Sequence, residues 1–562
     1  MTWGGNSMSA EWILSEVKGY KYISFDLYDT LLIRPYVKPK DLFRHMEKVY
    51  DAPGFAAARI KAEIQSRGSL RQETTFHRIY DFIPEEYRHL KRAELEFETR
   101  VYCPPHIRDC FNQLCKRHKV VILTDMYLPK LFIEGLLKKC GLVGYHRLYV
   151  SCEVNCNKAS GRLFRRALFD LGAWAEEMIH IGDNAHSDYS VPRLQGIYAA
   201  HTKRPIDRYL KKHPLVNKFY RKDRSVERSI MVAMDMIHSF EKTDDFWYEA
   251  AFRFGGPLAK DYLDFVDKNR KEDDSVFFIA RDGYNLKQIF DQMYPSARTE
   301  YVYAPRKLNV LIGSKYKKHK KYQEIIVPYL YPDFEGDPYE FFEKNKKEIL
   351  KKRKELFNAY ASRLGDHDKI CLVDVTTMKY SSQKLISDLY PEADIHGVYY
   401  TILDDDPEYP HDGYHVRDKV VKLWDNINLT EFFLTSPEAP IEGIDSEGKP
   451  IFKEICDEER QRLDIYDSIT QGEIDYCGLM INIFGEERLD FGYRNIRDWL
   501  KVLSSPLNSR SRRHLAEMKW PVDASHEKYV GMVYHPRDTW YHLRKTVLDS
   551  MWYISKRLKD ED

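Results

Sequence analysis

Three short apolar segments, each ending abruptly in acidic or hydroxyl residues, constrain this sequence more than any other feature. They are residues 22–25 (YISF), 120–123 (VVIL) and 178–181 (MIHI). Such short runs, rich in β-branched or aromatic residues, predict buried strands, and helical patterns separate them along the chain. Strands that alternate with helices form a parallel sheet with right-handed crossovers. Because polar groups gather beyond the carboxyl ends of such strands, we expect a functional site there.

Four motifs accompany these strands. In order, they are DLYDT at residues 26–30, TDM at 124–126, NKASG at 157–161 and GDNAHSD at 182–188. Together they resemble the four motifs of the haloacid dehalogenase-like (HAD) hydrolase superfamily, over about residues 20–205. The resemblance implies an α/β fold, with a Rossmann-like parallel-sheet core and a helical cap inserted at about residues 36–115.

The resemblance also implies a metal-assisted phosphoryl transfer. Asp26 would be the nucleophile that forms an aspartyl-phosphate, and it would also bind Mg²⁺, which prefers oxygen ligands. Asp183, Asp188 and the backbone carbonyl of Tyr28 would complete the metal ligands of the protein. Thr124 would donate a hydrogen bond to a phosphoryl oxygen. Lys158 would neutralise charge on the nucleophile and on the transferred group.

Tyr28 departs from the pattern of the superfamily's phosphatases. These usually carry a second aspartate two residues after the nucleophile, which acts as general acid and then as general base. Asp29 lies one residue later, and in an extended segment its side chain would point to the opposite side. A tyrosine here resembles the dehalogenase branch, whereas the pattern from Gly182 to Asp188 resembles the phosphatases. We interpret the site as a phosphotransfer site with altered acid–base chemistry at Tyr28. The alternative is a catalytically weak HAD domain that serves as a scaffold or regulatory binder for a transferase-like C-terminal domain.

The expected cap is rich in basic residues that include Arg59, Arg67 and Arg100. Such side chains could meet an anionic substrate inside a closed cap, where water is excluded. A solvated helical face is the simpler interpretation, and we favour it.

The second half repeats the alternation of strand and helix, with expected strands at residues 276–279, 370–373 and 395–400. Its ARDGY motif at 280–284 resembles the C-terminal region of HAD-like proteins encoded near bacterial capsule and surface-polysaccharide genes. Strand–loop–helix units of this kind can bind phosphates through loop N–H groups. Ordinary helix capping and turn formation would explain the same residue types. The expected second ligand site comprises Arg281, Asp282, Arg306, Asp374, Thr377, Ser381 and Ser382.

Length and charge fit a multidomain globular protein. The 562 residues carry a net charge of +1, which argues against a globally basic nucleic-acid binder. No run approaches 18 apolar residues, and the nine scattered cysteines favour reduced thiols in the cytoplasm. We expect a leader at 1–19, the HAD-like domain at 20–205, a connector at 206–245, a second α/β domain at 246–405 and a mostly helical region at 406–562.

Taken together, the sequence predicts a Mg²⁺-dependent phosphohydrolase or phosphotransferase that acts on a small phosphorylated metabolite. The resemblance to proteins of capsule gene clusters suggests a sugar phosphate of surface-polysaccharide biosynthesis as the substrate. It also suggests glycan-biosynthesis enzymes as partners.

Overall fold

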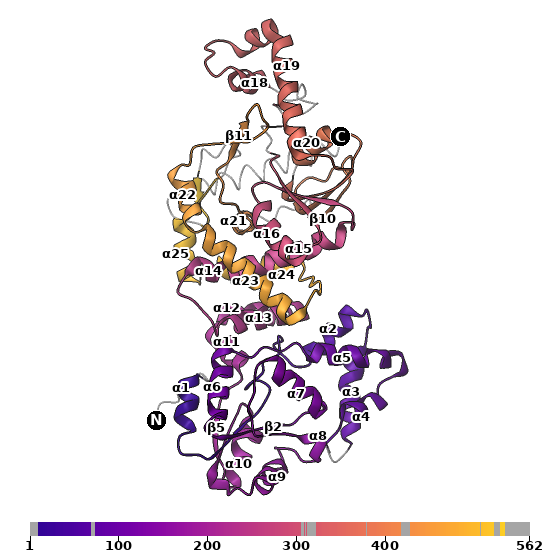
Figure 1. The fold of residues 1–562 in the computed structure, drawn as a ribbon, viewed down its shortest axis with the longest axis vertical. Helices are drawn as coiled ribbons and strands as arrows, with labels where there is room; N and C mark the ends of the chain where they lie inside the picture. Colours follow the sequence, from indigo (N-terminus) through magenta and orange to yellow (C-terminus); the bar gives the residue numbers. More distant parts are fainter. Residues whose placement is uncertain are drawn as a thin grey trace. The chain divides into compact units, whose positions relative to one another are not determined.

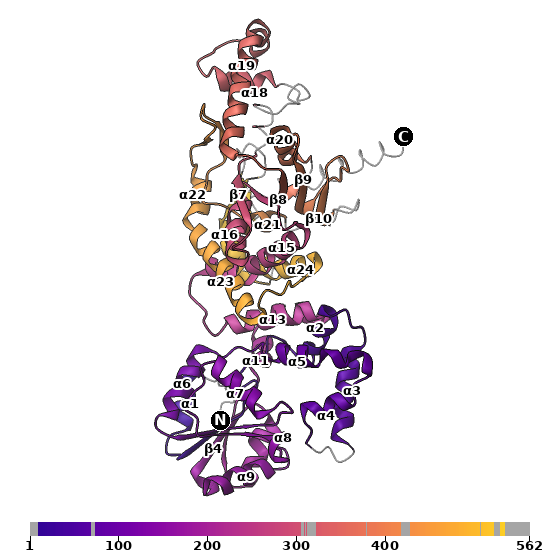
Figure 2. The same ribbon diagram turned by 45° about the vertical axis from the view of Figure 1, so that its right-hand side comes forward.

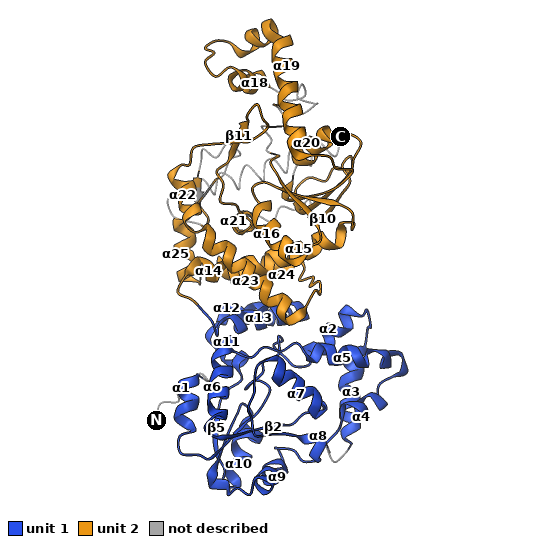
Figure 3. Ribbon diagram, in the orientation of Figure 1, with its two compact units in different colours: residues 1–242 blue, residues 243–562 orange. Residues whose placement is uncertain are grey.

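The computed structural model describes residues 9–68, 73–304, 308, 311, 322–377, 379–416, 427–505, 507–521 and 529–533. The chain divides into two compact units, Met1–Lys242 and Thr243–Asp562 (Figure 3). Each unit is built around a five-stranded parallel sheet of its own. In the part of the chain that the structure describes, no helix has both the length and the apolar character needed to cross a bilayer.

The sheet of the first unit has the strand order β3-β2-β1-β4-β5, and every pairing is parallel. The three strands expected from the sequence are the central ones, β1, β2 and β4. All four residues of β1 are buried, as expected for a strand covered by helices on both faces. The edge strands β3 and β5 were not predicted. The bounds are β1 (Tyr22–Phe25), β2 (Lys119–Thr124), β3 (Arg147–Val150), β4 (Met178–Gly182) and β5 (Tyr198–His201).

Helices connect these strands and continue past the last one (Figure 1). Residues 206–245, which we expected to be a connector, are largely helical and belong mostly to the first unit. The helices are α1 (Ala10–Glu16), α6 (Pro105–Cys115), α7 (Lys130–Lys139), α8 (Ser151–Val154), α9 (Arg162–Leu171), α10 (Val191–Leu194), α11 (Pro205–Lys212), α12 (Pro214–Asp223) and α13 (Val226–His238).

A helical cap is inserted between β1 and β2, as the sequence predicts. Figure 2 shows its helices α3 and α4 apart from the sheet of the same unit. Ile33 and Tyr102 exchange backbone hydrogen bonds of 2.8 Å where the chain leaves and re-enters the core. The cap is therefore shorter than expected, because α6 returns to the core and buries Phe111 and Leu114 there. Its helices are α2 (Asp41–Val49), α3 (Phe55–Arg67), α4 (Phe76–Asp81) and α5 (Lys91–Glu98), with the 3₁₀ helix η1 (Glu85–Leu90) before α5.

The sheet of the second unit has the order β10-β9-β8-β6-β7, again with parallel pairings. Strand β8 is longer than expected, so that Asp374 and Thr377 lie within it rather than in the loop beyond. Two small antiparallel pairs, β11–β12 and β13–β14, interrupt the expected helical region. The strands are β6 (Ser275–Ile279), β7 (Arg298–Val302), β8 (Lys369–Thr377), β9 (Asp394–Ile402), β10 (His411–Val416), β11 (Ile441–Ile444), β12 (Pro450–Phe452), β13 (Lys519–Pro521) and β14 (Tyr529–Gly531).

Helices pack around this second sheet, and α23 buries more of its residues than α24 or α25 does. The helices are α14 (Phe246–Ala250), α15 (Gly256–Asn269), α16 (Gly283–Met293), α18 (Gln323–Leu330), α19 (Pro338–Leu364), α20 (Ser381–Leu389), α21 (Ile427–Phe433), α22 (Asp457–Asp464), α23 (Tyr466–Phe484), α24 (Tyr493–Leu503) and α25 (Ser509–Glu517).

Candidate active site

The site begins where β1 and β4 end side by side. The backbone N–H of Asp26, the residue after β1, donates a 2.9 Å hydrogen bond to the carbonyl of Ile181 in β4. This bond fixes Asp26 at the carboxyl edge of the sheet. Gly182 then lets the chain fold back, because a Cβ atom there would come within 2.6 Å of the Asp188 side chain. The Asn184 N–H donates to Asp188 Oδ2 at 3.0 Å and holds that carboxylate in place.

Three carboxylates converge at this edge. One oxygen from each of Asp26, Asp183 and Asp188 lies within 4.8 Å of the others, and no second such group occurs among the described residues. Burial raises the pKa of Asp26 well above its usual value, and the two neighbouring carboxylates add to the effect despite the opposing charge of Lys158. Burial, Asp29 and Asp188 raise the pKa of Asp183 to about 7. An all-oxygen set of this kind fits Mg²⁺, whose charge would relieve the repulsion.

Lys158 supplies the positive charge that the protein itself places among these carboxylates. Its ammonium forms an ion pair with Asp26 and another, of 2.6 Å, with Asp188. The side chain is 4% exposed. Burial alone would raise the pKa of Asp188, but Lys158 and His180 outweigh it and hold that pKa below its usual range. The site therefore keeps Asp188 ionised at neutral pH.

Two residues that the sequence analysis missed support this arrangement. The backbone N–H of Lys158 donates to both carboxylate oxygens of Asp125, at 2.9 and 3.1 Å. His180 Nε2 lies 3.2 Å from Asp188 Oδ1, and its Nδ1 lies 2.8 Å from Ser24 Oγ. Asp125 stood inside the second motif and could have been found there. His180 carried no signal, because a histidine within an apolar strand is ordinarily a core residue.

Tyr28 lies against a cation rather than against a proton acceptor. The guanidinium carbon of Arg34 is 3.5 Å from the centre of the Tyr28 ring. The hydroxyl group is buried and has no hydrogen-bond partner among the described residues. Burial raises the pKa of Tyr28 above its usual value, although the charge of Arg34 opposes this. The phenol is therefore a poor base at neutral pH. Its predicted role in binding metal through the backbone stays a prediction, as does the predicted role of Thr124, the last residue of β2.

Asp29 is held elsewhere. It adopts a positive φ of +59°, and its carboxylate forms a 3.0 Å ion pair with Nε of Arg204. The chain at this point is thus not a simple extended strand. We expected the side chain of Asp29 to point away from that of Tyr28 because neighbouring residues of an extended strand alternate in direction. In the structure a turn with a positive φ at Asp29, and not an extended strand, directs its side chain to Arg204.

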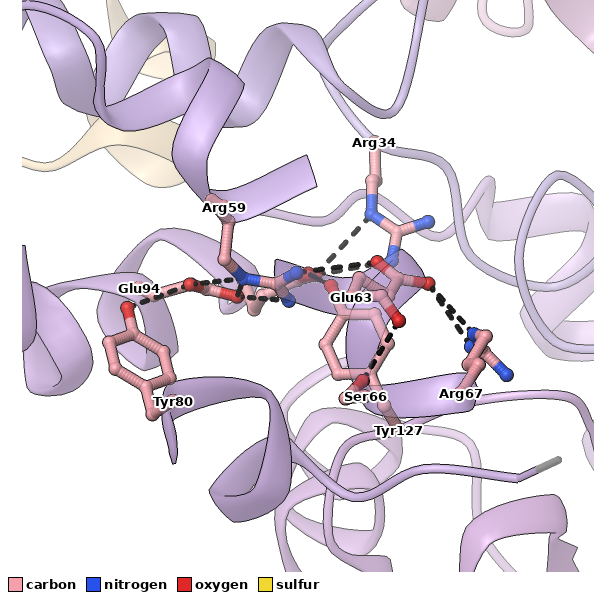
Figure 4. Close-up of polar contacts among 9 residues, drawn as sticks. Arg34, Arg59, Glu63, Ser66, Arg67, Tyr80, Glu94 and Tyr127 are labelled. Atoms are coloured by element: carbon pink, nitrogen blue, oxygen red, sulfur yellow. Dashed lines mark hydrogen bonds and ion pairs between the residues drawn. The ribbon is translucent and has the colours of Figure 1, made fainter. Parts of the chain in front are cut away.

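Two of the basic cap residues singled out in the sequence, Arg59 and Arg67, are paired within the cap itself. Figure 4 shows Arg59 bound to Glu94 and Arg67 bound to Glu63, at 2.7 and 3.1 Å. Arg59 is completely buried and paired with Glu94. It is therefore neither available to bind an anionic substrate nor part of a solvated helical face, the two interpretations that the sequence allowed. A further ion pair joins Arg34 to Glu98 at 3.1 Å, and the cap thus contributes a network of buried charge beside the core.

The second predicted ligand site is only partly assembled. Asp282 follows β6, Asp374 lies in β8, and burial together with Glu431 and Asp374 raises the pKa of Asp282 well above its usual value. Ser382 donates to Asp374 at 2.9 Å, and Arg281 forms an ion pair with Glu459 at 3.2 Å.

The remaining members of the predicted second site have other places. Thr377 accepts a hydrogen bond from the backbone N–H of Tyr380 at 3.0 Å and so stabilises a turn. Ser381 is the first residue of α20. Arg306 lies outside the described residues. Ligand binding at this site stays a prediction.

Comparison with known proteins gave matches to solved structures alone. No family model matches the chain, and no curated protein does. L-2-haloacid dehalogenase from Xanthobacter autotrophicus, with chloropropionic acid covalently bound, is 15% identical; the match covers 34% of this chain and 83% of that one, with a TM-score of 0.27. A HAD family enzyme from Bacteroides thetaiotaomicron, in complex with magnesium and inorganic phosphate, is 18% identical; the match covers 33% of this chain and 96% of that one, with a TM-score of 0.28.

Proposed function

We propose that the first unit is a Mg²⁺-dependent phosphohydrolase or phosphotransferase of the HAD type, with Asp26 as the nucleophile. One observation carries the proposal. Three carboxylates, Asp26 after β1, Asp183 after β4 and Asp188 in the π-helical turn Ala185–Ser190, converge within 4.8 Å, and the buried ammonium of Lys158 lies between two of them. Repulsion between like charges makes such a cluster costly unless a cation is part of its function.

The residues of the chain suit the two halves of such a reaction. An oxygen of Asp26 would attack phosphorus, the P–O bond to the leaving group would break, and its electron pair would leave with that oxygen. Lys158 would stabilise the negative charge of the transferred group at a site with little water. Mg²⁺ bound by Asp26, Asp183 and Asp188 would reduce repulsion between the phosphoryl group and the attacking carboxylate. Water would then cleave the aspartyl-phosphate, or an acceptor hydroxyl would take the phosphoryl group.

The finer parts of the proposal rest on the sequence motifs. We infer a small phosphorylated metabolite as the substrate, with a sugar phosphate of surface-polysaccharide or capsule biosynthesis as the first choice. Glycan-biosynthesis enzymes as partners and a cytoplasmic location belong to the same inference. The second candidate function is a weakly active HAD domain that binds a ligand for the second unit. The buried phenol of Tyr28, in the position of the usual acid and base, favours that candidate.

The test is hydrolysis of p-nitrophenyl phosphate with and without Mg²⁺. We expect activity in the wild type that needs Mg²⁺, and a loss of about 10³-fold or more in Asp26→Asn, as for removal of other nucleophiles. Acid quenching should leave phosphate covalently bound to the wild type and not to Asp26→Asn. Asp282→Asn, at the corresponding strand end of the second unit, serves as the control and should keep full activity. A well-folded Asp26→Asn protein that retains turnover would exclude the covalent mechanism.

A further inference from the structure

The cap contacts the core at the two loops that carry the site. The backbone N–H of Phe76, the first residue of α4, donates to the carbonyl of Tyr127 at 2.7 Å. Tyr127 lies in the loop after β2, directly beyond the second motif. The second contact is a 2.9 Å hydrogen bond from Asn157 Nδ2 to Glu73 Oε1. Asn157 immediately precedes Lys158, so this bond reaches the loop that presents the buried lysine.

The Lys158 loop is therefore held from both sides. Asp125, in the core, accepts the backbone N–H of Lys158, whereas Glu73, in the cap, accepts the side-chain amide of Asn157. The carbonyl oxygen of the same side chain forms a hydrogen bond within the loop, because Asn157 Oδ1 accepts the N–H of Ser160 at 2.8 Å. Asn157 thus links the cap to the turn that fixes Lys158.

Glu73 is itself held in place by the charges of the cap. Its side chain is 8% exposed and lies 4.0 Å from Arg67. Arg67 pairs with Glu63, and Glu63 pairs with the buried Arg59 at 3.3 Å (Figure 4). A continuous series of charged contacts therefore runs from the interior of the cap to the residue that touches the Lys158 loop. The series gives Glu73 a charged neighbour within the cap in addition to its contact with Asn157.

We propose that Glu73 is a positioning residue, which sets the Lys158 loop through Asn157 when the cap lies on the core. The inference rests on the proposed function and deepens it, because it couples cap closure to completion of the site. Lys158 must reach Asp26 and Asp188 together, and a displacement of about 1 Å in such a group can cost about 10²-fold in rate. Glu73 does not touch the reacting atoms.

The contact can be broken from either side and then restored with its polarity reversed. Glu73→Ala removes the acceptor. Asn157→Asp removes the donor but keeps Oδ1 for the N–H of Ser160. In the double variant Glu73→Gln/Asn157→Asp, the glutamine amide can donate to the aspartate, so the hydrogen bond returns. Glu73→Gln alone keeps the acceptor oxygen and loses only the charge.

We expect Glu73→Ala and Asn157→Asp each to lower kcat for p-nitrophenyl phosphate about 10- to 100-fold, with a small change in KM. Glu73→Gln and the double variant should recover most of the loss. The control is Glu96→Gln, since Glu96 is an exposed cap glutamate that pairs with the exposed Arg92; it should keep wild-type kcat. A double variant no better than Asn157→Asp alone would overturn the proposal.

A second readout does not depend on turnover. Backbone hydrogen exchange of residues 158–163 reports the loop, where the N–H groups of Lys158, Ser160 and Gly161 are bonded within the core or the turn. Exchange there should be faster in Glu73→Ala and return to the wild-type rate in Glu73→Gln. If the wild type shows no phosphatase activity, the proposed function fails, and this exchange comparison still decides the coupling. Unchanged exchange in Glu73→Ala would overturn it.

Discussion

Both units carry polar residues at the ends of the strands of a five-stranded parallel sheet, but only in the first unit do three carboxylates of the described residues converge. Counted from the first strand of each unit, the orders are 3-2-1-4-5 and 2-1-3-4-5, and in both the order reverses beside the first strand. In the first unit three carboxylates converge there on one ammonium. In the second unit the charges of Glu431 and Asp374 raise the pKa of Asp282, but the described residues hold no such convergence of three carboxylates there. Glu459 is bound by two arginines and Asp374 by Ser382. The topology thus provides the location, and the side chains alone decide whether a cation is needed.

The largest expected effect tests this difference by removing one buried cation from each unit. Lys158 and Arg462 are 4% and 3% exposed, and each is paired with buried acids. Lys158→Met should lower the free energy of unfolding by about 3–5 kcal/mol without Mg²⁺, because two buried carboxylates lose their cation. Arg462→Met should lower it by a similar amount, because Thr435 and the carbonyls of Ser436 and Glu438 lose their donor, although Glu459 keeps Arg281. Mg²⁺ should restore much of the loss in Lys158→Met and none in Arg462→Met. Denaturant unfolding with and without the ion measures both.

Equal responses of the two variants to Mg²⁺ would contradict the comparison. Such a result would mean that the carboxylates of the first unit need a bound cation as little as those of the second unit do. A small loss in Lys158→Met without the ion would have a different meaning, namely that Asp26 takes up a proton in place of the missing ammonium.

The sequence predicted the parts of this comparison that depend on local patterns. The central strands of the first sheet were recognisable because each is a short apolar run that ends in an acid or a threonine. The edge strand β3 begins with an exposed arginine, and β5 is bounded by partly exposed residues, so neither gives that pattern. In the second unit Asp374 was placed beyond its strand, because the run of polar residues that ends β8 looks like a loop.

Contacts between distant parts of the chain could not be predicted in this way. Glu73 and Asn157 are 84 residues apart, and the pair of Arg34 and Glu98 spans 64. Nothing in either local sequence indicates its partner, because the packing of the cap on the core decides which side chains meet. The burial of Arg59 escaped prediction for the same reason, since its basic neighbours suggested a solvated face.

Tyr28 stands where related phosphatases carry an acidic residue, and we expect this difference to slow the breakdown of the aspartyl-phosphate in the first unit. In Tyr28→Asp, the charge of Arg34 would keep the new carboxylate ionised, and an ionised carboxylate can activate the hydrolytic water. We expect breakdown of the aspartyl-phosphate to accelerate by about 10²-fold, the lower end for general acid–base catalysis. Burst kinetics with acid quenching measures the lifetime of the intermediate.

Tyr28→Asn is the control for this experiment, because it removes the same ring and hydroxyl but provides no base. It should not accelerate breakdown. Faster turnover in Tyr28→Asn than in the wild type would show that loss of the buried ring, rather than gain of a carboxylate, changes the rate. No turnover in either variant or in the wild type would favour the second candidate function.

A smaller effect concerns metal binding and thermal stability. At ten times its dissociation constant, an ion that binds only the folded state adds about 1.4 kcal/mol. In a unit of this size that raises the melting temperature by about 3–6 °C. We expect this shift in the wild type and in Asp282→Ala, but not in Asp183→Ala. Calorimetric scans with added Mg²⁺ test it, and an equal shift in Asp183→Ala would place the ion elsewhere.

The smallest expected effect concerns Asp29, the carboxylate next to Tyr28 in the sequence. Its ion pair with Arg204 is partly exposed, at 20% and 28%, and such pairs contribute about 1 kcal/mol or less. Its left-handed backbone is one that asparagine also adopts readily. Asp29→Asn should therefore change the unfolding free energy by less than about 1 kcal/mol, and p-nitrophenyl phosphate turnover by no more than about threefold. If turnover instead falls as far as in Asp26→Asn, then Asp29 supplies the acid or base, and Tyr28→Asp should no longer accelerate breakdown of the intermediate.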